Sequence, residues 1–143
     1  PSDNRALTRE ERGVEDMLHT RYQDIRRSRR EYGTVRVRPG DVLRSYCFES
    51  CTCLAQEFAP LLRGRGHDAR TLYLRRGRQA MSVSLRHPEG RWESWDSHRV
   101  VIFRVGRRWL VVDPVGLGTT RPEPLGNWLA RLRQPALYLG SLQ

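Results

Sequence analysis

Residues 50–74 restrict the fold more than any other stretch, because they specify a helix, a turn and a strand in succession. Ser50 is a favourable helix N-cap, which puts Cys51 at the first helical position. Four apolar residues then recur at helical spacing and give this helix one apolar face: Leu54, Phe58, Leu61 and Leu62. A glycine-rich turn ends the helix, and the alternation over residues 70–74 predicts a strand.

A cysteine in the first turn of a helix is placed for chemistry. The partial positive charge at a helix N-terminus stabilises the thiolate, which is the nucleophilic form. The alternative is that Cys51 is a small buried apolar residue. A histidine and a carboxylate elsewhere in the chain are needed to favour the nucleophile.

A histidine and a carboxylate both occur in a hairpin that the sequence predicts further along the chain. Residues 98–104 and 107–112 are rich in β-formers and flank Val105-Gly106, which we expect to form a tight turn. With that dipeptide at the centre, His98 lies directly opposite Asp113, with Cβ atoms about 4.5–5.5 Å apart. A carboxylate in this position fixes the histidine tautomer and stabilises its protonated form. Asp113 is therefore the expected orienting acid.

Asp96 is a rival for that role, since it lies two residues before His98. A neighbour on the same strand is a less direct partner than a cross-strand one, so Asp113 is favoured. His87, by contrast, belongs to a predicted turn at residues 87–90, and we expect it to be a solvent-exposed loop residue.

Cys51, His98 and Asp113, in this order on a helix and a following hairpin, resemble the catalytic core of the transglutaminase-like branch of papain-fold cysteine enzymes. About half of the chain carries the resemblance, in Cys51 with Ala55 and in residues 58–63, 66–70, 98–100 and 106–114. The short format is also similar to bacterial protein glutaminase and to the deamidating domains of toxins of the Pasteurella multocida toxin type. Residues 1–45 and 120–143 match no pattern of that family.

The resemblance implies a Cys-His-Asp triad that attacks glutamine side chains in proteins. The Cys51 thiolate attacks the carboxamide carbon, His98 protonates the departing ammonia, and a thioester remains. Water then gives deamidation, which we favour, whereas an amine gives the crosslink of a transglutaminase. Peptide-bond hydrolysis by a cysteine protease is the near alternative.

The same resemblance implies where such a protein acts and what it meets. We expect a delivered bacterial toxin or effector, secreted or carried by a bacterial secretion system and acting in the target-cell cytoplasm. Its partners are a target protein bearing a reactive glutamine and a cognate immunity protein. We expect neither a cofactor nor a metal.

Three further residues are candidates for contact with substrate. Trp95 can form a wall of the acyl-binding cleft, although a tryptophan in a strand more often serves packing. Ser45 and Tyr46 precede Cys51 and are candidates for the upstream donor that completes an oxyanion hole.

The three cysteines cluster at positions 47, 51 and 53. An odd, clustered set does not form a disulfide framework. A disulfide between Cys47 and Cys51 would mask the nucleophile. A structural zinc site would lack a fourth ligand. Cys47 and Cys53 are rival nucleophiles, but only Cys51 lies 15 residues before Gly66, as the family pattern has it.

The positive charge of the chain comes from arginine alone. The formal net charge is +10, and all 26 basic residues are arginine. Three explanations compete. The arginine content can reflect a GC-rich genome, it can form a surface that binds nucleic acid, or the lack of lysine can be an advantage in a ubiquitinating cell. A non-catalytic arginine-rich module that binds nucleic acid or an acidic protein is the alternative of a different class. Nucleic acid is not expected, because no stacking or helix-in-groove motif accompanies the charge.

The expected organisation is one α+β domain over residues 1–143. We expect a loose terminus at 1–7, an N-terminal helix within 8–32, a catalytic core at 45–115, and a loop, helix and strand at 116–143. A capping box at residues 8–11 opens the first helix, and Gly33 ends it.

Within that organisation, residues 41–46 are expected to form a short helical turn. No stretch is long and apolar enough for a membrane span. Because the chain starts with Pro1 rather than methionine, we expect a processed or excised part of a longer protein.

Overall fold

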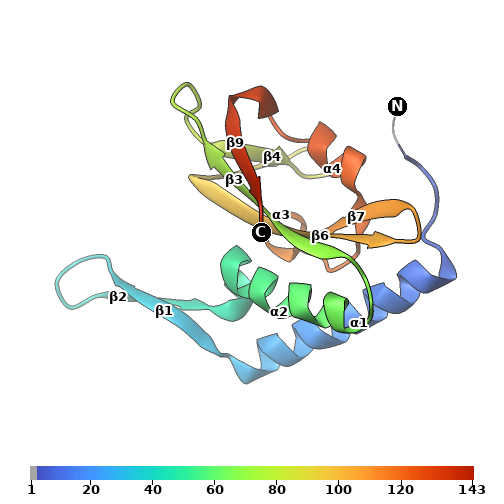
Figure 1. Ribbon diagram of the computed structural model, residues 1–143. Helices are drawn as coiled ribbons and strands as arrows, with labels where there is room; N and C mark the ends of the chain where they lie inside the picture. The colour runs from blue at the N-terminus through green and yellow to red at the C-terminus, as the bar shows by residue number, and fades with distance from the viewer. Residues whose placement is uncertain (1–2) are drawn as a thin grey trace.

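The computed structural model describes residues 3–143, in which helices pack against an antiparallel β-sheet in an α+β arrangement (Figure 1). In chain order the elements are α1 (Arg9–Ser28), β1 (Glu31–Arg36), β2 (Val42–Tyr46), the 3-10 turn η1 (Cys47–Glu49), α2 (Cys51–Gly64), β3 (Ala69–Arg76), β4 (Val83–Arg86), β5 (Trp92–Trp95), β6 (Ser97–Val105), β7 (Arg108–Val112), α3 (Pro114–Leu117), β8 (Glu123–Pro124), α4 (Leu125–Ala130), η2 (Pro135–Leu137) and β9 (Tyr138–Leu142).

The first helix begins as predicted and ends early. The Thr8 side chain accepts from the Glu11 N–H, and the Glu11 carboxylate accepts from the Thr8 N–H, so the capping box is confirmed. The helix ends at Ser28 because Arg29 takes the left-handed conformation, with φ of 47°. The prediction that Gly33 ends it was wrong, since Gly33 lies inside β1.

The central sheet has the order β8-β7-β6-β3-β9, with every neighbouring pair antiparallel. One face carries α2, with α1 beyond it, over a core that includes Leu18, Leu54, Phe58, Phe103 and Leu110. The other face carries β4, β5 and α4 over a second core that includes Val83, Leu85, Ile102, Val111 and Trp128. The site described below is built from the start of α2, the start of β6 and the residue that follows β7.

The hairpin of β6 and β7 differs in register from the prediction. Val105 pairs with Arg108, and Val101 pairs with Val112, so the turn residues are Gly106 and Arg107. Gly106 has φ of 60° and occupies the first central turn position, where a positive φ favours glycine. The predicted centre at Val105-Gly106 was therefore wrong.

The shift moves every pairing by two residues. Asp113 comes one step beyond the last pair and falls beside Val100 rather than opposite His98. Because side chains alternate with a period of two, a two-residue shift leaves His98 and Asp113 on the same face of the sheet. They are diagonal neighbours instead of direct ones.

The segment before the nucleophile helix is a hairpin instead of the helical turn predicted over residues 41–46. β2 pairs with β1 from Arg36 opposite Val42 to Glu31 opposite Tyr46. The connection turns at Gly40, whose φ is 87°. We call residues 31–46 the arm, because in Figure 1 this hairpin extends away from the rest of the molecule.

His87 also differs from its prediction. It is 2% exposed, with Nδ1 3.8 Å from Glu89 and Nε2 3.6 Å from Glu93. Its backbone N–H donates to the carbonyl of Arg91 and closes the turn. The expectation of a solvent-exposed residue was wrong.

Among residues 3–143, the helices are all too short or too polar to cross a membrane.

Candidate active site

Cys51 occupies the first position of α2, as its sequence context predicts. The Ser50 side chain caps the helix by accepting from the Cys53 N–H at 3.2 Å, and the Ser50 carbonyl accepts from the Leu54 N–H. Cys51 is a free thiol and is half-buried. A thiol at this position lies in the favourable field of the helix N-terminus.

His98 and Asp113 form a buried pair. Nε2–H of His98 donates to both carboxylate oxygens of Asp113, each at 3.0 Å. Their exposed fractions are 1% and 2%. The contact fixes the tautomer, because the proton on Nε2 leaves Nδ1 to exchange a proton with another group.

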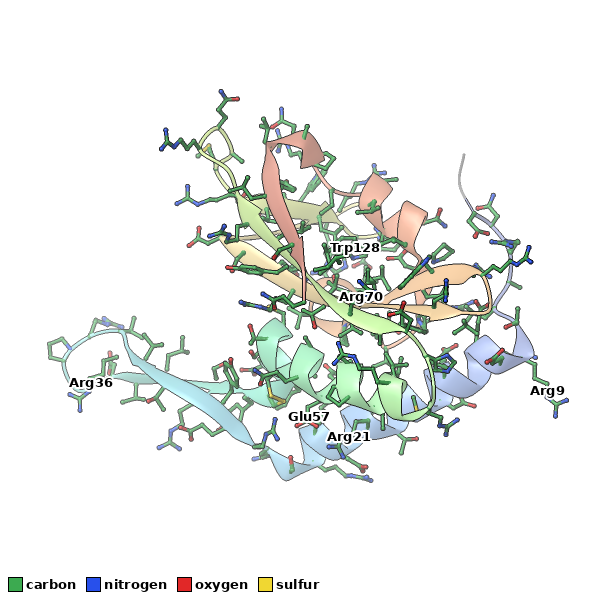
Figure 2. All side chains as sticks on the ribbon, viewed as in Figure 1. Arg9, Arg21, Arg36, Glu57, Arg70 and Trp128 are labelled. Atoms are coloured by element: carbon green, nitrogen blue, oxygen red, sulfur yellow. A yellow bond between two sulfur atoms is a disulfide. The ribbon has the colours of Figure 1, made fainter. Side chains whose placement is uncertain are left out.

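Asp113 is itself held by two further donors. The Trp128 indole Nε1–H donates to Oδ2 at 3.1 Å, and the Gly116 N–H donates to Oδ1 at 3.0 Å. Trp128 is fully buried and comes from α4, and Figure 2 shows it within the body of the molecule. Donors from three elements thus determine how the carboxylate faces His98.

Gly116 permits this arrangement by lacking a side chain. A Cβ at this position would lie 2.3 Å from Asp113 Oδ2 and 2.9 Å from its Cγ. Real Cβ contacts are essentially never that short, so any other residue displaces the carboxylate. Neither Gly116 nor Trp128 was singled out from the sequence. The Asp-Pro that opens α3 is the local signal that Asp113 caps a helical turn.

Cys51 and His98 shift each other's proton affinity. Burial lowers the pKa of His98, but the charge and hydrogen bonds of Asp113 and the interaction with Cys51 outweigh it and raise the pKa to about 9. Burial raises the pKa of Cys51, but His98, the Arg99 backbone N–H and the Thr52 side chain outweigh it, and the pKa falls below its usual value. These opposite shifts favour a thiolate beside an imidazolium.

His98 Nδ1 is left for the thiol. It is buried and has no regular hydrogen-bond partner within the described residues. Catalytic hydrogen bonds are often loose before substrate binds. The arrangement therefore runs from Cys51 through His98 to Asp113.

Trp95 contacts the reactive histidine directly. Its ring stacks on the His98 imidazole with centroids 3.9 Å apart and planes 7° from parallel. The electron-rich ring face favours a cation, so this contact stabilises an imidazolium. Asp96 does not share this position, because it is 90% exposed and pairs with Arg76 at 3.5 Å.

Ser45 and Tyr46 lie at the end of β2, half-buried. Tyr46 stacks on Phe48 with ring centroids 5.8 Å apart. In the part of the chain that the structure describes, no hydrogen bond joins either side chain to the three residues of the triad. Their predicted role in oxyanion binding stays a prediction.

Arg99 is a residue near the thiol that the sequence did not single out. Its backbone N–H helps to lower the pKa of the Cys51 thiol, and its Nη1 donates to Thr52 Oγ1 at 3.0 Å. Its guanidinium lies 3.9 Å from the centroid of the Tyr73 ring. These contacts hold the guanidinium between the Tyr73 ring and Thr52, the residue that follows Cys51.

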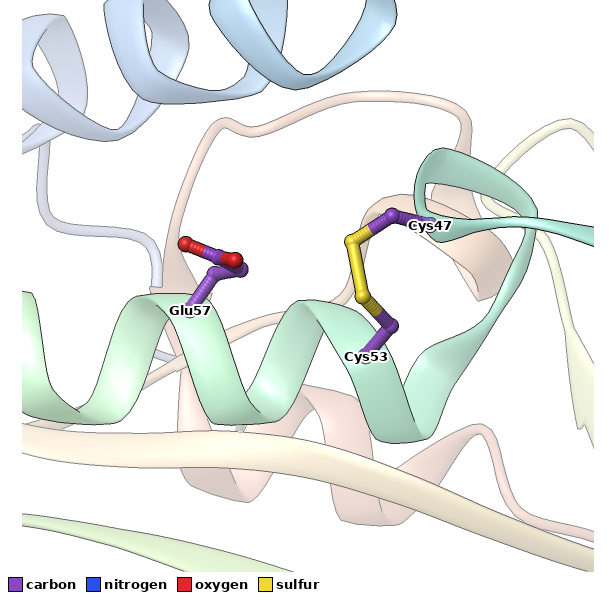
Figure 3. A group of neighbouring side chains, drawn as sticks. All are labelled: Cys47, Cys53 and Glu57. Carbon is purple, nitrogen blue, oxygen red and sulfur yellow. A yellow bond between two sulfur atoms is a disulfide. The ribbon is translucent and has the colours of Figure 1, made fainter. Parts of the chain in front are cut away.

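A disulfide joins Cys47 to Cys53, with Cα atoms 5.2 Å apart (Figure 3). The alternative of a Cys47–Cys51 disulfide, which would have masked the nucleophile, does not occur, because Cys51 is free. Helix geometry explains the choice, because positions two apart on a helix point about 200° from one another. Cys53 faces η1 while Cys51 faces β6. Cys51 is thus the free thiol among the three cysteines.

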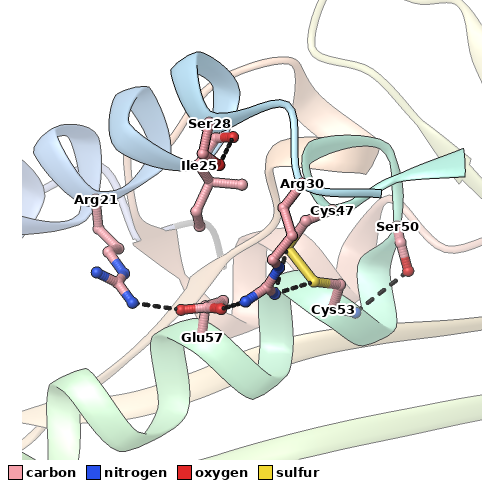
Figure 4. Close-up of a disulfide and its surroundings, with 8 residues drawn as sticks. All are labelled: Arg21, Ile25, Ser28, Arg30, Cys47, Ser50, Cys53 and Glu57. Atoms are coloured by element: carbon pink, nitrogen blue, oxygen red, sulfur yellow. Dashed lines mark hydrogen bonds and ion pairs between the residues drawn. A yellow bond between two sulfur atoms is a disulfide. The ribbon is translucent and has the colours of Figure 1, made fainter. Parts of the chain in front are cut away.

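Cys47, Cys53 and Glu57 bring three potential metal-binding atoms within 4.8 Å of one another. Both sulfurs are used in the disulfide, and Glu57 binds Arg21 and Arg30 at 2.6 Å each (Figure 4). Burial raises the pKa of Glu57, but the two arginines outweigh it and hold the pKa below its usual value. This donor set does not fit a metal ion, because cysteine binds zinc as a thiolate and both sulfurs are bonded to each other in the disulfide.

Comparison with known proteins gives no relative: no family model, no curated protein and no solved structure matches the chain. Its chemistry therefore has to follow from the geometry of the site.

Proposed function

We propose that this chain is a cysteine-dependent protein glutamine deamidase with Cys51 as nucleophile, His98 as acid and base, and Asp113 as the orienting carboxylate. The observation that carries the proposal is the buried His98 imidazole, which is hydrogen-bonded to the buried Asp113 carboxylate and leaves Nδ1 for the free thiol of Cys51. The opposite pKa shifts of Cys51 and His98 are those of an activated thiol.

In the first step the Cys51 thiolate attacks the carboxamide carbon of a glutamine. The developing oxyanion lies at the N-terminus of α2, where the backbone N–H of Cys51 supplies a donor. Protonated His98 then gives its proton to the departing nitrogen, and ammonia leaves a thioester on Cys51.

In the second step water attacks the thioester. His98, now neutral, takes a proton from the water, and Asp113 stabilises the imidazolium that forms. The products are glutamate and the free thiol. A protein amine in place of water would give a crosslink instead.

The proposed chemistry also implies a particular kind of fold. We infer a papain- or transglutaminase-like core, supported by a nucleophile helix that packs on an antiparallel sheet and by the order cysteine, histidine, aspartate along the chain.

We also infer a bacterial toxin or effector that is secreted or delivered, with an immunity protein as cognate partner. The disulfide supports passage through an oxidising compartment, where such bonds form and persist.

The test is ammonia release together with intact mass of a glutamine-containing protein from host cells, with wild type and Cys51→Ala compared. We expect a gain of about one mass unit for each glutamine converted, with equal ammonia. Cys51→Ala should abolish both. Amine-dependent crosslinks would indicate a transglutaminase, and fragments without ammonia a protease. Identical results for the two proteins would contradict cysteine catalysis.

A further inference from the structure

The arm concentrates the exposed apolar surface of the molecule. Of the ten large apolar side chains exposed in the described residues, five lie on this hairpin or its connection: Tyr32, Val35, Val37, Val42 and Leu43. Scattered apolar residues on a surface need no explanation, but a cluster indicates an interaction site. The arm is therefore a candidate site for binding another molecule.

The register of the arm separates two kinds of face. Val35 lies opposite Leu43, so both point to one face, and each is 62% exposed. Arg36 and Arg44 point to the other face, next to Val42 and Thr34. Figure 2 shows Arg36 out on the arm, away from the body. One face thus presents the apolar pair Val35 and Leu43, and the other presents two arginines together with Val42.

The arm also has free edges. β1 and β2 form a two-stranded sheet of their own, and neither pairs with another strand within residues 3–143. A two-stranded hairpin is marginal alone and gains from a third strand. An unpaired edge is a template for an extended peptide.

The base of the arm is fixed firmly to the first turn of α2, the helix that carries Cys51. The Cys47 N–H donates to the Arg30 carbonyl at 3.0 Å, and Arg30 Nη2 donates to the sulfurs of Cys47 and Cys53 at 3.2 and 2.8 Å (Figure 4). The disulfide then ties Cys47 to the first turn of α2. A segment that lies along β2 therefore runs toward the helix that carries Cys51.

The charge of the arm indicates the chemistry of its partner. Arg38 pairs with Asp41, whereas Arg36 and Arg44 have no carboxylate partner in the described part of the chain. A second copy of this chain, with its net charge of +10, would bring like charges together. An acidic partner fits instead.

We propose that the arm is the docking surface for the protein substrate, taken as an extended segment of alternating apolar and acidic residues that adds to the arm as a further strand. Main-chain hydrogen bonds hold the segment, Val35 and Leu43 cover its apolar side chains, and Arg36 and Arg44 pair with its carboxylates. This inference rests on the proposed function, because it uses the arm to bring a glutamine to Cys51.

The test compares three glutamine substrates by ammonia release. The first is a strand-forming peptide in which valine and glutamate alternate around one glutamine, the second has arginine in place of glutamate, and the third is carbobenzoxy-glutaminyl-glycine. We expect wild type to prefer the acidic peptide over the basic one by about tenfold or more in kcat/KM.

The deciding variant is Val35→Ser with Leu43→Ser, both at exposed positions that leave the core intact. We expect kcat/KM for the acidic peptide to fall about tenfold through KM, with activity on the dipeptide unchanged. The matched control is Met81→Ser, which removes an apolar side chain that is even more exposed from another part of the surface. Arg36→Glu with Arg44→Glu should reverse the preference between the charged peptides.

Equal losses on the peptide and the dipeptide, or no loss on either, would overturn the docking proposal. The absence of ammonia from all three substrates would instead overturn the proposed function. In that case docking is decided by fluorescence anisotropy of the labelled acidic peptide with Cys51→Ala. Binding that is lost in the Val35→Ser, Leu43→Ser form supports the arm, and binding that is unchanged contradicts it.

Discussion

The two sides of the first turn of α2 hold cysteines of opposite character. On the side facing β6, Cys51 is a free thiol beside His98, and its pKa is lowered. On the side facing η1, Cys53 is buried in a disulfide that Arg30 contacts. The comparison shows that helix geometry, rather than residue type, separates a reactive sulfur from a structural one two positions away.

The largest expected effect lies on the reactive side. Asp113→Asn keeps the size of the side chain but removes the charge that stabilises the imidazolium and fixes its tautomer. We expect kcat for ammonia release to fall about 10³–10⁴-fold. The matched control is Asp96→Asn, an exposed position paired with Arg76, which should leave kcat unchanged. Equal effects of the two substitutions would contradict the assignment of Asp113.

Removal of the Cys47–Cys53 disulfide should change the stability of the protein and leave the reactivity of Cys51 unchanged. Cys47→Ala with Cys53→Ala opens a short loop, and we expect the free energy of unfolding to fall by about 2 kcal/mol. Denaturant unfolding of both forms measures it. Cys51 in the variant should still react with iodoacetamide faster than an ordinary thiol. Loss of this reactivity at Cys51 would show that the thiol depends on the disulfide for its activation.

A smaller effect is expected at the glycine that lets Asp113 approach. Gly116→Ala introduces a Cβ that collides with the carboxylate, so the His98 contact is displaced. We expect kcat to fall about tenfold or more. Gly126→Ala is the control, because nothing lies within 4 Å of a Cβ there. A Gly116→Ala protein as active as that control would show that Asp113 tolerates displacement.

Local signals in the sequence were enough for part of this site. The Ser50 cap predicts Cys51 at the first helical position, because capping depends on neighbours along the chain. Alternation over the two strands predicts that His98 and Asp113 share a face, and this survives a two-residue error in register. The error itself arose because the turn can be centred on either side of Gly106.

Other parts depend on tertiary contacts that no local signal reports. Trp128 reaches Asp113 from α4, and its role requires knowing how the C-terminal segment packs on the sheet. The disulfide depends on where η1 brings Cys47, and η1 follows strand β2, where a helical turn was expected. The burial of His87, which is 2% exposed, likewise has no signal in the residues of its turn.

The most direct test of the account is the pH dependence of Cys51 alkylation. Iodoacetamide modification, followed by intact mass from pH 5 to pH 10, reports the thiolate, and Cys51→Ala supplies the blank. Because His98 stays protonated up to about pH 9, its charge favours the thiolate throughout the neutral range. The alkylation midpoint of wild type should therefore lie below the usual cysteine pKa.

His98→Gln removes that charge, so its midpoint should rise toward the usual value and its rate at pH 7 should fall about tenfold. A wild-type midpoint at the usual cysteine pKa, unchanged in His98→Gln, would contradict the claim that this histidine activates Cys51.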